Sequence, residues 1–490
     1  MTPQQPTAPL VIASNRGPVD FELTGKGITA RRGEGGLIAV LGPVLAGGDG
    51  VWVAAARTEG DRLMARRADA GGVLSPVDLP EGRVAVRGLE LDPRDYEAYY
   101  SSVGTGTLWF LHHHLLDEAW PPDDERFRAD WAAYLRVNER FAAACAETAA
   151  PGAVVLLQDY HLAAAPALLR ARRPDVRIAH FTMCPWADPQ RFRQLPAGAA
   201  CALVEGMLGA DVVAFLATRW ADSFLRCCAE LGLEVDHGAR RVRHRAGEAA
   251  VRVYRVGVDS AALRDRCGHP RVRSAARELD ALVGDRRLVA RVERMEPAKN
   301  AVRGITGFGE FLAAHPEQAG RVVHQVIAYT SRTGLESYRR YASEVQAAAR
   351  AVNRRFGTPA WTPVLLETAN DFDRGLALMA RADVLVVNPV RDGMNLVAKE
   401  CAAVNDRDAA VILSRETGAA EELGGAALLV DPLDTTQLAG AIATALAMPR
   451  AERRHRLRAL RAGATALPPR RWLATVLADL SALAPTATGA

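Results

Sequence analysis

The residues whose types best suit chemistry follow an apolar stretch late in the chain. Residues 384–387 are apolar on both faces, which is typical of a strand buried in a parallel sheet. Asp392 follows this stretch, and Asn395, Lys399 and Glu400 open the next predicted helix. In open α/β sheets ligands bind outside the carboxyl ends of strands, where a helix N-terminus attracts an anion. Acidic residues are also ordinary at a solvated helix start, so this stretch alone leaves both interpretations open.

A second candidate site lies near the N-terminus. The predicted strand 10–14 leads to Arg16, and Gly35 and Gly36 precede an apolar run at 37–45. Glycines before a helix let a diphosphate approach the backbone. The same pattern is common in a plain turn, so it indicates a phosphate site only in combination with other residues.

Strands and helices alternate along most of the chain, which predicts parallel sheets with right-handed crossovers. In the first half we expect strands at 10–14, 51–55, 154–157, 176–182 and 211–216. In the second half we expect strands at 288–292, 322–328, 363–367, 383–388, 409–413 and 427–430. The fold class is therefore α/β, with two doubly wound, Rossmann-like sheets.

The length of 490 residues exceeds one ordinary core and favours two domains. We expect an N-terminal domain over 1–256, a C-terminal domain over 257–470, and a helix and tail over 471–490 that can pack back on the first domain. Two such domains facing each other form a cleft, the usual place for a small-molecule site. Seven charged residues expected at strand ends suit a ligand with several phosphates: Arg16, Arg294, Lys299, Arg332, Asp159, Asp392 and Glu400.

Composition excludes several kinds of protein. A net charge of +4 is small for a nucleic-acid binder, and the basic run 240–245 is expected to be a solvated hairpin or helix edge. The apolar runs are too short to span a membrane. Seven scattered cysteines and the absence of a signal-peptide pattern favour the cytoplasm. A homo-oligomer stays open.

No metal or cofactor is expected. The neighbouring histidines 112–114 cannot converge on one ion, because successive side chains point in different directions. Two Asp-x-Asp runs, 371–373 and 406–408, fit a helix start and a loop better than a metal site.

Motifs spread from about residue 10 to about residue 456 resemble the trehalose-6-phosphate synthase family, which is glycosyltransferase family 20. They are Asn15-Arg16, Gly35-Gly36-Leu37, Tyr99-Tyr100, Leu108-Trp109, Asp159-Tyr160-His161, Val292-Glu293-Arg294 with Lys299, Ser331-Arg332, and the highly specific RDGMNLVAKE at 391–400. Segments 158–161, 297–300 and 388–391 are most similar to actinobacterial members close to glucosylglycerol-phosphate synthases and to the validamycin pseudo-glycosyltransferase. The resemblance implies a retaining GT-B fold.

The resemblance also implies roles toward a nucleotide-diphosphate sugar. Gly35 and Gly36 would form a loop over the diphosphate, with charge supplied by Arg294 and Lys299. Asp392 would contact the donor sugar. The other implied donor contacts are Asn395, the backbone N–H groups of Leu396, Val397, Ala398 and Lys399, and Glu400, which would bind the ribose hydroxyls.

On the acceptor side the resemblance implies a phosphate held by Arg16, Tyr100 and Arg332, with Trp109 packed beside it. Asp159 would orient the acceptor hydroxyl. The implied catalytic set is Asp159, Arg294, Lys299 and Asp392. The implied reaction moves a hexose from UDP- or GDP-glucose to a phosphorylated acceptor, by default glucose 6-phosphate, giving trehalose 6-phosphate. Fixed cations and helix N–H groups would stabilise the leaving diphosphate without a metal, and the acceptor would attack from the same face.

Two positions depart from the family. Met183 stands where the family has a His that contacts the donor sugar, and an unpartnered buried hydroxyl there would cost about 1–3 kcal/mol. Ala55 stands where the family has the second Trp of its Trp-x-Gly-Trp run, whereas Trp52 matches the first. These departures leave open an ordinary synthase, a pseudo-glycosyltransferase or secondary-metabolite transferase with another donor or acceptor, and a catalytically silent sugar-nucleotide-binding protein.

Overall fold

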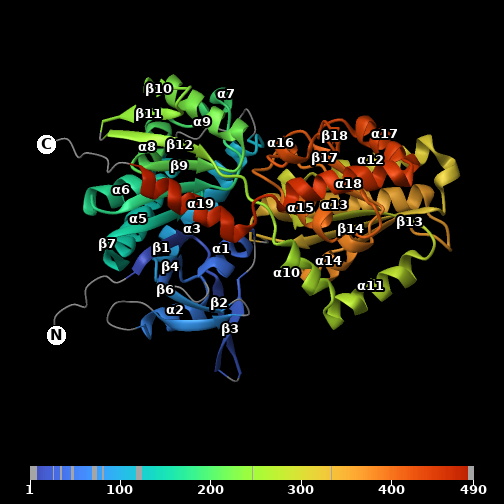
Figure 1. Ribbon diagram of the computed structural model, residues 1–490, viewed down its shortest axis with the longest axis horizontal. Coiled ribbons are helices and arrows are strands. Elements are labelled where there is room, and N and C mark those ends of the chain that lie inside the picture. The colour runs from blue at the N-terminus through green and yellow to red at the C-terminus, as the bar shows by residue number, and fades with distance from the viewer. Residues whose placement is uncertain are drawn as a thin grey trace. The chain divides into compact units, whose positions relative to one another are not determined.

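The computed structural model describes residues 8–25, 27–33, 36–45, 49–68, 74–79, 82–116, 124–245, 247–332 and 334–483. The chain forms two compact units (Figure 1). Unit 1 comprises Met1–Val256 together with Pro469–Ala490, and unit 2 comprises Gly257–Pro468. Gly35, one of the predicted phosphate-loop residues, lies outside the described residues.

Unit 1 is built on a ten-stranded sheet in the order β10-β11-β12-β9-β8-β7-β1-β4-β6-β5. Neighbouring strands from β12 to β6 run parallel, and antiparallel strands flank them at both edges. The strands are β1 (Ala8–Ser14), β4 (Gly50–Ala55), β5 (Leu74–Leu79), β6 (Gly82–Leu89), β7 (Ala149–Gln158), β8 (Arg177–Thr182), β9 (Val212–Phe215), β10 (Glu234–Asp236), β11 (Arg241–His244) and β12 (Gly247–Val253). A separate hairpin pairs β2 (Val19–Thr24) with β3 (Gly27–Arg32).

All five strands predicted for the first half are confirmed within a few residues. The basic run 240–245 falls on β11 and its turn, so the predicted solvated hairpin is also confirmed. Its arginines form ion pairs with acidic side chains, such as Arg241 with Glu248 and Arg243 with Glu234. The hairpin β2–β3, the edge strands β5 and β10, and the strands β6 and β12 were not predicted. Edge strands carry a weaker apolar pattern than strands buried on both faces.

Helices cover both faces of the unit 1 sheet. They are α1 (Gly36–Leu45), α2 (Glu59–Arg66), α3 (Pro93–Glu97), the π-helix η1 (Ala98–Trp109), α4 (Phe110–His112), α5 (Glu125–Thr148), η2 (Tyr160–Leu162), α6 (Ala165–Arg172), α7 (Pro189–Phe192), α8 (Ala197–Leu208) and α9 (Thr218–Glu230). In α5 the buried aromatic residues Phe127, Tyr134 and Phe141 recur every seven residues, so they share one face. Asp124 caps this helix by accepting the Phe127 N–H at 2.6 Å.

The last helix, α19 (Pro469–Ala482), packs on unit 1 (Figure 1). The buried Trp472 donates its indole N–H to the Tyr254 carbonyl at 3.1 Å and meets Phe181 edge-on at 4.9 Å. The Tyr254 hydroxyl donates to Asp479 at 2.8 Å. These contacts join the end of the chain to strand β8 and to the segment after β12.

Unit 2 has a six-stranded, all-parallel sheet in the order β15-β14-β13-β16-β17-β18. The strands are β13 (Arg287–Met295), β14 (Val322–Thr330), β15 (Val364–Glu367), β16 (Val384–Val387), β17 (Ala410–Ser414) and β18 (Leu428–Val430), so all six predicted strands are confirmed. The helices are α10 (Ser260–Cys267), α11 (Pro270–Val283), η3 (Pro297–Lys299), α12 (Ala301–Ala314), η4 (Pro316–Gln318), α13 (Glu336–Phe356), α14 (Phe372–Arg381), α15 (Leu396–Val404), α16 (Ala420–Leu423), α17 (Thr435–Ala447) and α18 (Arg450–Thr465).

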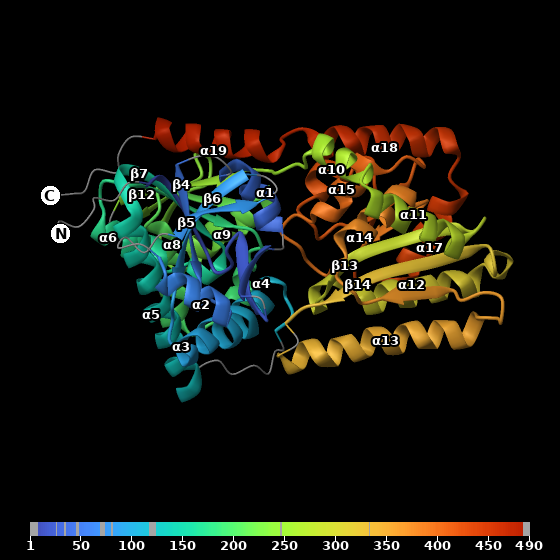
Figure 2. The ribbon, with the colours of Figure 1, turned by 90° about the horizontal axis from the view of Figure 1, so that it is seen from below.

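Figure 2 shows α12, α13 and α17 on one side of this sheet and α10, α11, α14, α15 and α18 on the other. The first layer packs through residues such as Phe308, Val326 and Ile442, which are almost fully buried. Asp371 caps α14, and the 406–408 run lies in a loop, as predicted for both Asp-x-Asp runs.

Candidate functional site

Three of the predicted donor residues meet at the carboxyl ends of the neighbouring strands β13 and β16. The Lys299 ammonium lies 2.5 Å from Asp392 Oδ2, and both side chains are largely buried. The Asn395 amide donates to the same carboxylate oxygen at 3.1 Å. Asn395 also caps α15 by accepting the Ala398 N–H at 3.4 Å. The Asp392 carboxylate is therefore held by one cation and one amide.

Backbone hydrogen bonds fix the loop that carries Asp392. The Asp392 N–H donates to the Glu416 carbonyl at 3.1 Å, and the Gly418 N–H donates to the Asp392 carbonyl at 3.0 Å. The Ala419 N–H donates to the Met394 carbonyl at 2.9 Å. The loop after β17 thus forms a short parallel bridge with the loop after β16, and this bridge holds the start of α15 in place.

The first turn of α15 presents the predicted N–H groups. A helix leaves the N–H groups of its first three residues without intrahelical acceptors, which here means Leu396, Val397 and Ala398. Lys399 is one residue further on, and its fully buried ammonium lies 2.5 Å from Glu422 on α16. The Lys399 side chain therefore joins two helices, and an anion at the helix start would meet backbone N–H groups.

Glu400 has an unusual environment for a carboxylate. It is partly buried, and this loss of solvation raises its pKa to about 7. Among the described residues no hydrogen-bond donor or cation contacts its carboxylate. A carboxylate of this kind is well suited to accept hydrogen bonds from ligand hydroxyls.

A buried carboxylate that the sequence did not single out joins two predicted site arginines. Glu296 is almost fully buried, and its Oε2 lies 3.4 Å from Arg294 while its Oε1 lies 3.5 Å from Arg332. The Ser331 hydroxyl donates to Glu296 Oε1 at 3.2 Å, and Arg332 donates to the Tyr338 hydroxyl at 2.6 Å. The Glu296 charge is the main reason that the pKa of Arg294 is raised. Glu296 follows the last residue of β13, and its contact with Arg332 joins residues that are distant in sequence.

Arg291 is a second residue that the sequence did not single out. Its side chain is fully buried and donates to Glu293 Oε1 at 2.7 Å, to the Asn388 side-chain oxygen and to the Lys299 carbonyl. A side chain at Gly304 would collide with it, since a Cβ there would lie 2.3 Å from Arg291 Nη1. Arg291 therefore joins strand β13 to the two loops that carry Lys299 and Asp392.

Unit 1 brings two of the predicted acceptor residues together. Arg16 follows β1 and donates to the Tyr100 hydroxyl at 3.4 Å. The Tyr100 ring stacks on His161 and also on Tyr96, and the ring centroids are 5.7 Å apart in both pairs. Tyr100 belongs to the π-helix η1, a form that is frequent at functional sites. This arrangement holds a cation and a phenol side by side, which suits a phosphate.

Asp159 lies just after β7 in a strained conformation, with φ of 68°. Its N–H donates to the Phe181 carbonyl at 2.7 Å, and its Oδ1 accepts the Met183 N–H at 3.3 Å. Burial raises the pKa of Asp159, and hydrogen bonds from the backbone of Tyr160, Cys184 and Met183 partly oppose that rise. Met183, the departure noted in the sequence, is thus a direct neighbour of the predicted catalytic carboxylate.

The remaining predicted positions of unit 1 lie in η1, α1 and β4. Trp109 ends η1 and is almost fully buried, with its ring 4.3 Å from that of His113. Gly36 begins α1. Ala55 ends β4 and is buried, and Trp52 on the same strand donates its indole N–H to Ser14 at 2.8 Å.

The histidines 112–114 make separate contacts. His112 Nδ1 accepts the Ala187 N–H at 3.1 Å, His113 Nδ1 donates to the Trp109 carbonyl at 2.7 Å, and His114 lies 3.5 Å from Asp188. Each of the three side chains therefore has its own partner within unit 1. In the described part of the chain, no group of three or more His, Cys, Asp or Glu side chains is arranged to hold a metal ion. None of the described helices is both long and apolar enough to cross a membrane.

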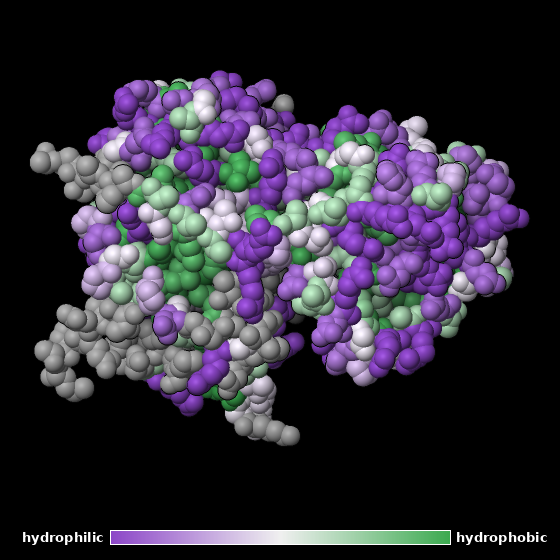
Figure 3. All heavy atoms as spheres, viewed as in Figure 1, coloured by the Kyte–Doolittle hydropathy of each residue, from purple (hydrophilic) through white to green (hydrophobic). Residues whose placement is uncertain are grey.

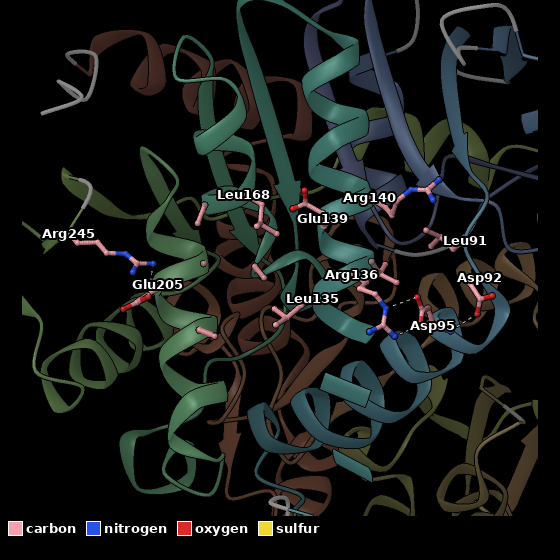
Figure 4. Close-up of a pocket in the computed structure, with 15 residues that line it drawn as sticks. Leu91, Asp92, Asp95, Leu135, Arg136, Glu139, Arg140, Leu168, Glu205 and Arg245 are labelled. Carbon is pink, nitrogen blue, oxygen red and sulfur yellow. Dashed lines mark hydrogen bonds and ion pairs between the residues drawn. The ribbon is translucent and has the colours of Figure 1, made fainter. Parts of the chain in front are cut away.

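A pocket of about 680 Å³ lies elsewhere on unit 1, between α5, α6 and α8 (Figure 4). Its floor is apolar, with Leu135 and Leu168, and its rim carries charges that include Arg136, which is 2.6 Å from Asp95. None of the predicted substrate residues lines it, so it is separate from the candidate site.

Two Rossmann-like units with parallel sheets and cationic strand ends define a GT-B glycosyltransferase. The chain belongs to glycosyltransferase family 20, whose sequence pattern it matches over residues 8–482. It is 34% identical over 493 residues to the trehalose-6-phosphate synthase of Mycobacterium avium, covering 97% of this chain and 96% of that protein.

Solved structures of related proteins have the same fold. An E. coli trehalose-6-phosphate protein bound with UDP-2-fluoro glucose has a TM-score of 0.84 at 25% identity, covering 97% of this chain and 99% of the other. An α,α-trehalose-phosphate synthase (UDP-forming) from Burkholderia xenovorans, in complex with glucose-6-phosphate, has a TM-score of 0.83 at 26% identity, covering 96% and 99%. The predicted family and the predicted fold class are therefore confirmed.

Proposed function

We propose that this chain transfers glucose from UDP-glucose to glucose 6-phosphate and so forms trehalose 6-phosphate. The observation that carries the proposal is the cluster of Lys299, Asp392 and Asn395 beside the N-terminus of α15. It combines a cation, a carboxylate and free helix N–H groups at adjacent strand ends. The names of the relatives support the substrates, since one structure holds a UDP-glucose analogue and another holds glucose-6-phosphate.

In this proposal the cations and the helix N–H groups that bind the donor diphosphate belong to unit 2. Lys299, Arg294 and the N–H groups of Leu396 and Val397 stabilise the negative charge that grows on the leaving UDP. The Lys299 ammonium is already oriented by Asp392, so little reorganisation is needed when the charge develops. Glu400 accepts hydrogen bonds from the ribose hydroxyls, and the Asp392 carboxylate contacts the glucose ring.

We also propose that the transfer needs no metal ion. Two fixed cations and the positive end of a helix provide the charge that a divalent ion provides in many other transferases. We propose no enzymic nucleophile: the acceptor hydroxyl attacks from the face that the UDP leaves, so the configuration at the anomeric carbon is retained. Asp159 orients this hydroxyl, and its raised pKa favours a carboxyl that can share a proton.

The acceptor phosphate is proposed to bind to the three residues that the sequence resemblance assigns to it, Arg16, Tyr100 and Arg332. Arg16 and Tyr100 are already in contact, and Arg332 is held by Glu296 and Tyr338. Arginine is the residue best suited to a phosphate, because its planar guanidinium offers two parallel N–H groups. Cytoplasmic location is proposed along with these soluble, phosphorylated substrates.

A second candidate function is supported by Met183 and Ala55. Met183 contacts Asp159 through its backbone and brings a thioether in place of a hydrogen-bonding ring, whereas Ala55 removes an aromatic surface. Both changes alter what a sugar would meet. The alternative is a transferase with another phosphorylated acceptor, as in the glucosylglycerol-phosphate synthases or the validamycin pseudo-glycosyltransferase.

The test is a nucleotide-release assay with purified protein and UDP-, GDP- and ADP-glucose, each with and without glucose 6-phosphate. UDP release that requires glucose 6-phosphate supports the proposal. UDP release only with glycerol phosphate or a phosphorylated cyclitol would favour the second candidate. Binding of UDP-glucose without release in any combination would contradict both and identify a sugar-nucleotide-binding protein.

A further inference from the structure

A group of arginines lies at the amino ends of the unit 2 strands, opposite the edge that carries the donor residues. Arg287 begins β13, Arg381 ends α14, and Arg453 lies in the first turn of α18. Arg287 and Arg294 are seven residues apart on one strand, which corresponds to about 23 Å. This arginine cluster, defined as Arg287, Arg381 and Arg453, is therefore distinct from the proposed donor site.

The three guanidinium groups converge on one carboxylate. Asp383 Oδ1 lies 3.1 Å from Arg287 Nε and 3.9 Å from Arg453 Nη1, and its Oδ2 lies 3.7 Å from Arg381 Nη1. Asp383 Oδ2 also accepts the Leu288 N–H at 2.9 Å. Arg381 also donates its Nε–H to Asp280 Oδ1 at 2.5 Å, so three cations face two carboxylates.

The arginine cluster has more N–H donors than its surroundings satisfy. Arg381 and Arg453 are 8% and 7% exposed. Two buried nitrogens, Arg287 Nη2 and Arg453 Nε, have neither a hydrogen-bond nor an ion-pair partner among the described residues. Three more, Arg287 Nε, Arg381 Nη1 and Arg453 Nη1, form no hydrogen bond and contact Asp383 only as ion pairs. A buried charged donor without a partner costs more than a neutral one, so this arrangement is unfavourable unless an acceptor is supplied.

Further cations surround the cluster on its solvent side. Arg450 and Arg454 on α18 pair with Asp408 at 3.0 and 3.5 Å, and Arg407 lies 3.7 Å from Asp280. Burial, and after it the positive charge of Arg287, lower the pKa of Arg453, while Asp383 and Asp408 oppose this shift. Figure 3 shows hydrophilic residues over α18.

We propose that the arginine cluster is a binding site for a small phosphate-bearing anion. A phosphate group offers several acceptor oxygens and a double negative charge, which suits the two unpartnered N–H donors and the three that form ion pairs with Asp383 without a hydrogen bond. The anion competes with Asp383 for the same guanidinium groups. It binds independently of the glycosyl transfer proposed above.

The experiment measures hydrogen exchange by mass spectrometry on peptides that cover 281–288 and 450–458, during titration with inorganic phosphate and, separately, glycerol 3-phosphate. The peptides that cover 294–300 report the donor site and so separate the two sites. Phosphate is expected to slow exchange in the first two segments of the wild-type protein. Protection by glycerol 3-phosphate as well would show that the site accepts a monoester, and protection by inorganic phosphate alone would show that it takes the free ion.

Two variants should change the affinity for phosphate in opposite directions. Arg453→Gln should weaken phosphate binding at these segments by about tenfold or more, because one charged donor pair is lost. Asp383→Asn should strengthen it, because the competing charge is removed while the side-chain oxygen that accepts the Leu288 N–H is kept. The matched control Arg454→Gln, on the same helix but half-exposed and paired with Asp408, should change affinity by less than about twofold. Absence of protection in the wild-type protein, or unchanged affinity in both Arg453→Gln and Asp383→Asn, would overturn the proposal.

Discussion

Replacing Arg291 by leucine tests how the two donor loops are held together. Arg291 is fully buried and is the cation that pairs with the buried Glu293, at 2.7 Å. The substitution leaves the Glu293 carboxylate without this partner and removes the link to Asn388 and the Lys299 carbonyl. Breaking a buried ion pair from one side costs about 3–5 kcal/mol.

Protonation of Glu293 limits this cost. Its pKa is already raised by burial, an effect that Arg291 opposes, so the pKa rises further in the variant. Keeping a carboxyl of ordinary pKa 4.5 neutral at pH 7 costs about 3.4 kcal/mol, at about 1.36 kcal/mol per pH unit. We therefore expect Arg291→Leu to lower the free energy of unfolding of unit 2 by about 3 kcal/mol at pH 7.

The pH dependence has a definite sign. In the variant, Glu293 has a higher pKa in the folded than in the unfolded protein, so the folded state binds more protons between the two values. The stability lost at pH 7 is therefore regained as the pH falls toward the pKa of Glu293 in the unfolded protein. The difference between wild type and variant should shrink from pH 7 to pH 5.

The assay is urea unfolding followed by hydrogen exchange in peptides that cover β13, which reports unit 2 directly. The double variant Arg291→Leu, Glu293→Gln is the matched control, because it also removes the buried negative charge. It should recover most of the stability. It should not recover the UDP affinity, because the hydrogen bond from Arg291 to the Lys299 carbonyl is still missing. A loss below about 1 kcal/mol in the single variant would refute the reasoning, as would a double variant with wild-type UDP affinity.

Three further predictions follow from the site geometry. UDP affinity of the wild type should rise between pH 6 and pH 8, because Glu400, with a pKa of about 7, goes from about one tenth to about nine tenths ionised; Glu400→Gln should remove that part of the rise, and identical profiles in a titration series would exclude Glu400 from the site. Arg332→Ala should raise the KM for the phosphorylated acceptor by about tenfold or more while changing the Kd for UDP little, and equal losses in both would contradict its assignment to the acceptor phosphate. Glu296→Gln should raise both the acceptor KM and the UDP Kd, because it releases Arg332 and Arg294 together, whereas Glu317→Gln, a change to an exposed acid of the same unit, should alter neither in steady-state and binding measurements.

The parallel strands could be predicted from the sequence because each is a short apolar run, as with residues 384–387. Such runs are buried on both faces of a sheet, and few other elements have this pattern. The β2–β3 hairpin and the π-helix η1 could not be predicted, because exposed strands and π-helices have no comparable periodicity.

Some of the site residues could also be predicted from the sequence, and others could not. Asp392 and Asn395 could be placed at a strand end from their order along the chain alone. The roles of Arg291 and Glu296 depend on contacts with Asn388 and Arg332, which are distant in sequence. A buried arginine in a strand has no sequence signature that separates it from an exposed one, so only packing reveals it. For Lys399 the sequence predicted a ligand contact through the backbone N–H only, and the structure adds that the side chain pairs with Glu422.

The central claim is most directly tested by the mass and anomeric configuration of the product formed from UDP-glucose and glucose 6-phosphate. The account predicts a hexose disaccharide monophosphate with both anomeric centres in the α configuration, formed in step with UDP release. UDP release without that disaccharide, or a product with an inverted anomeric centre at the transferred glucose, would contradict it.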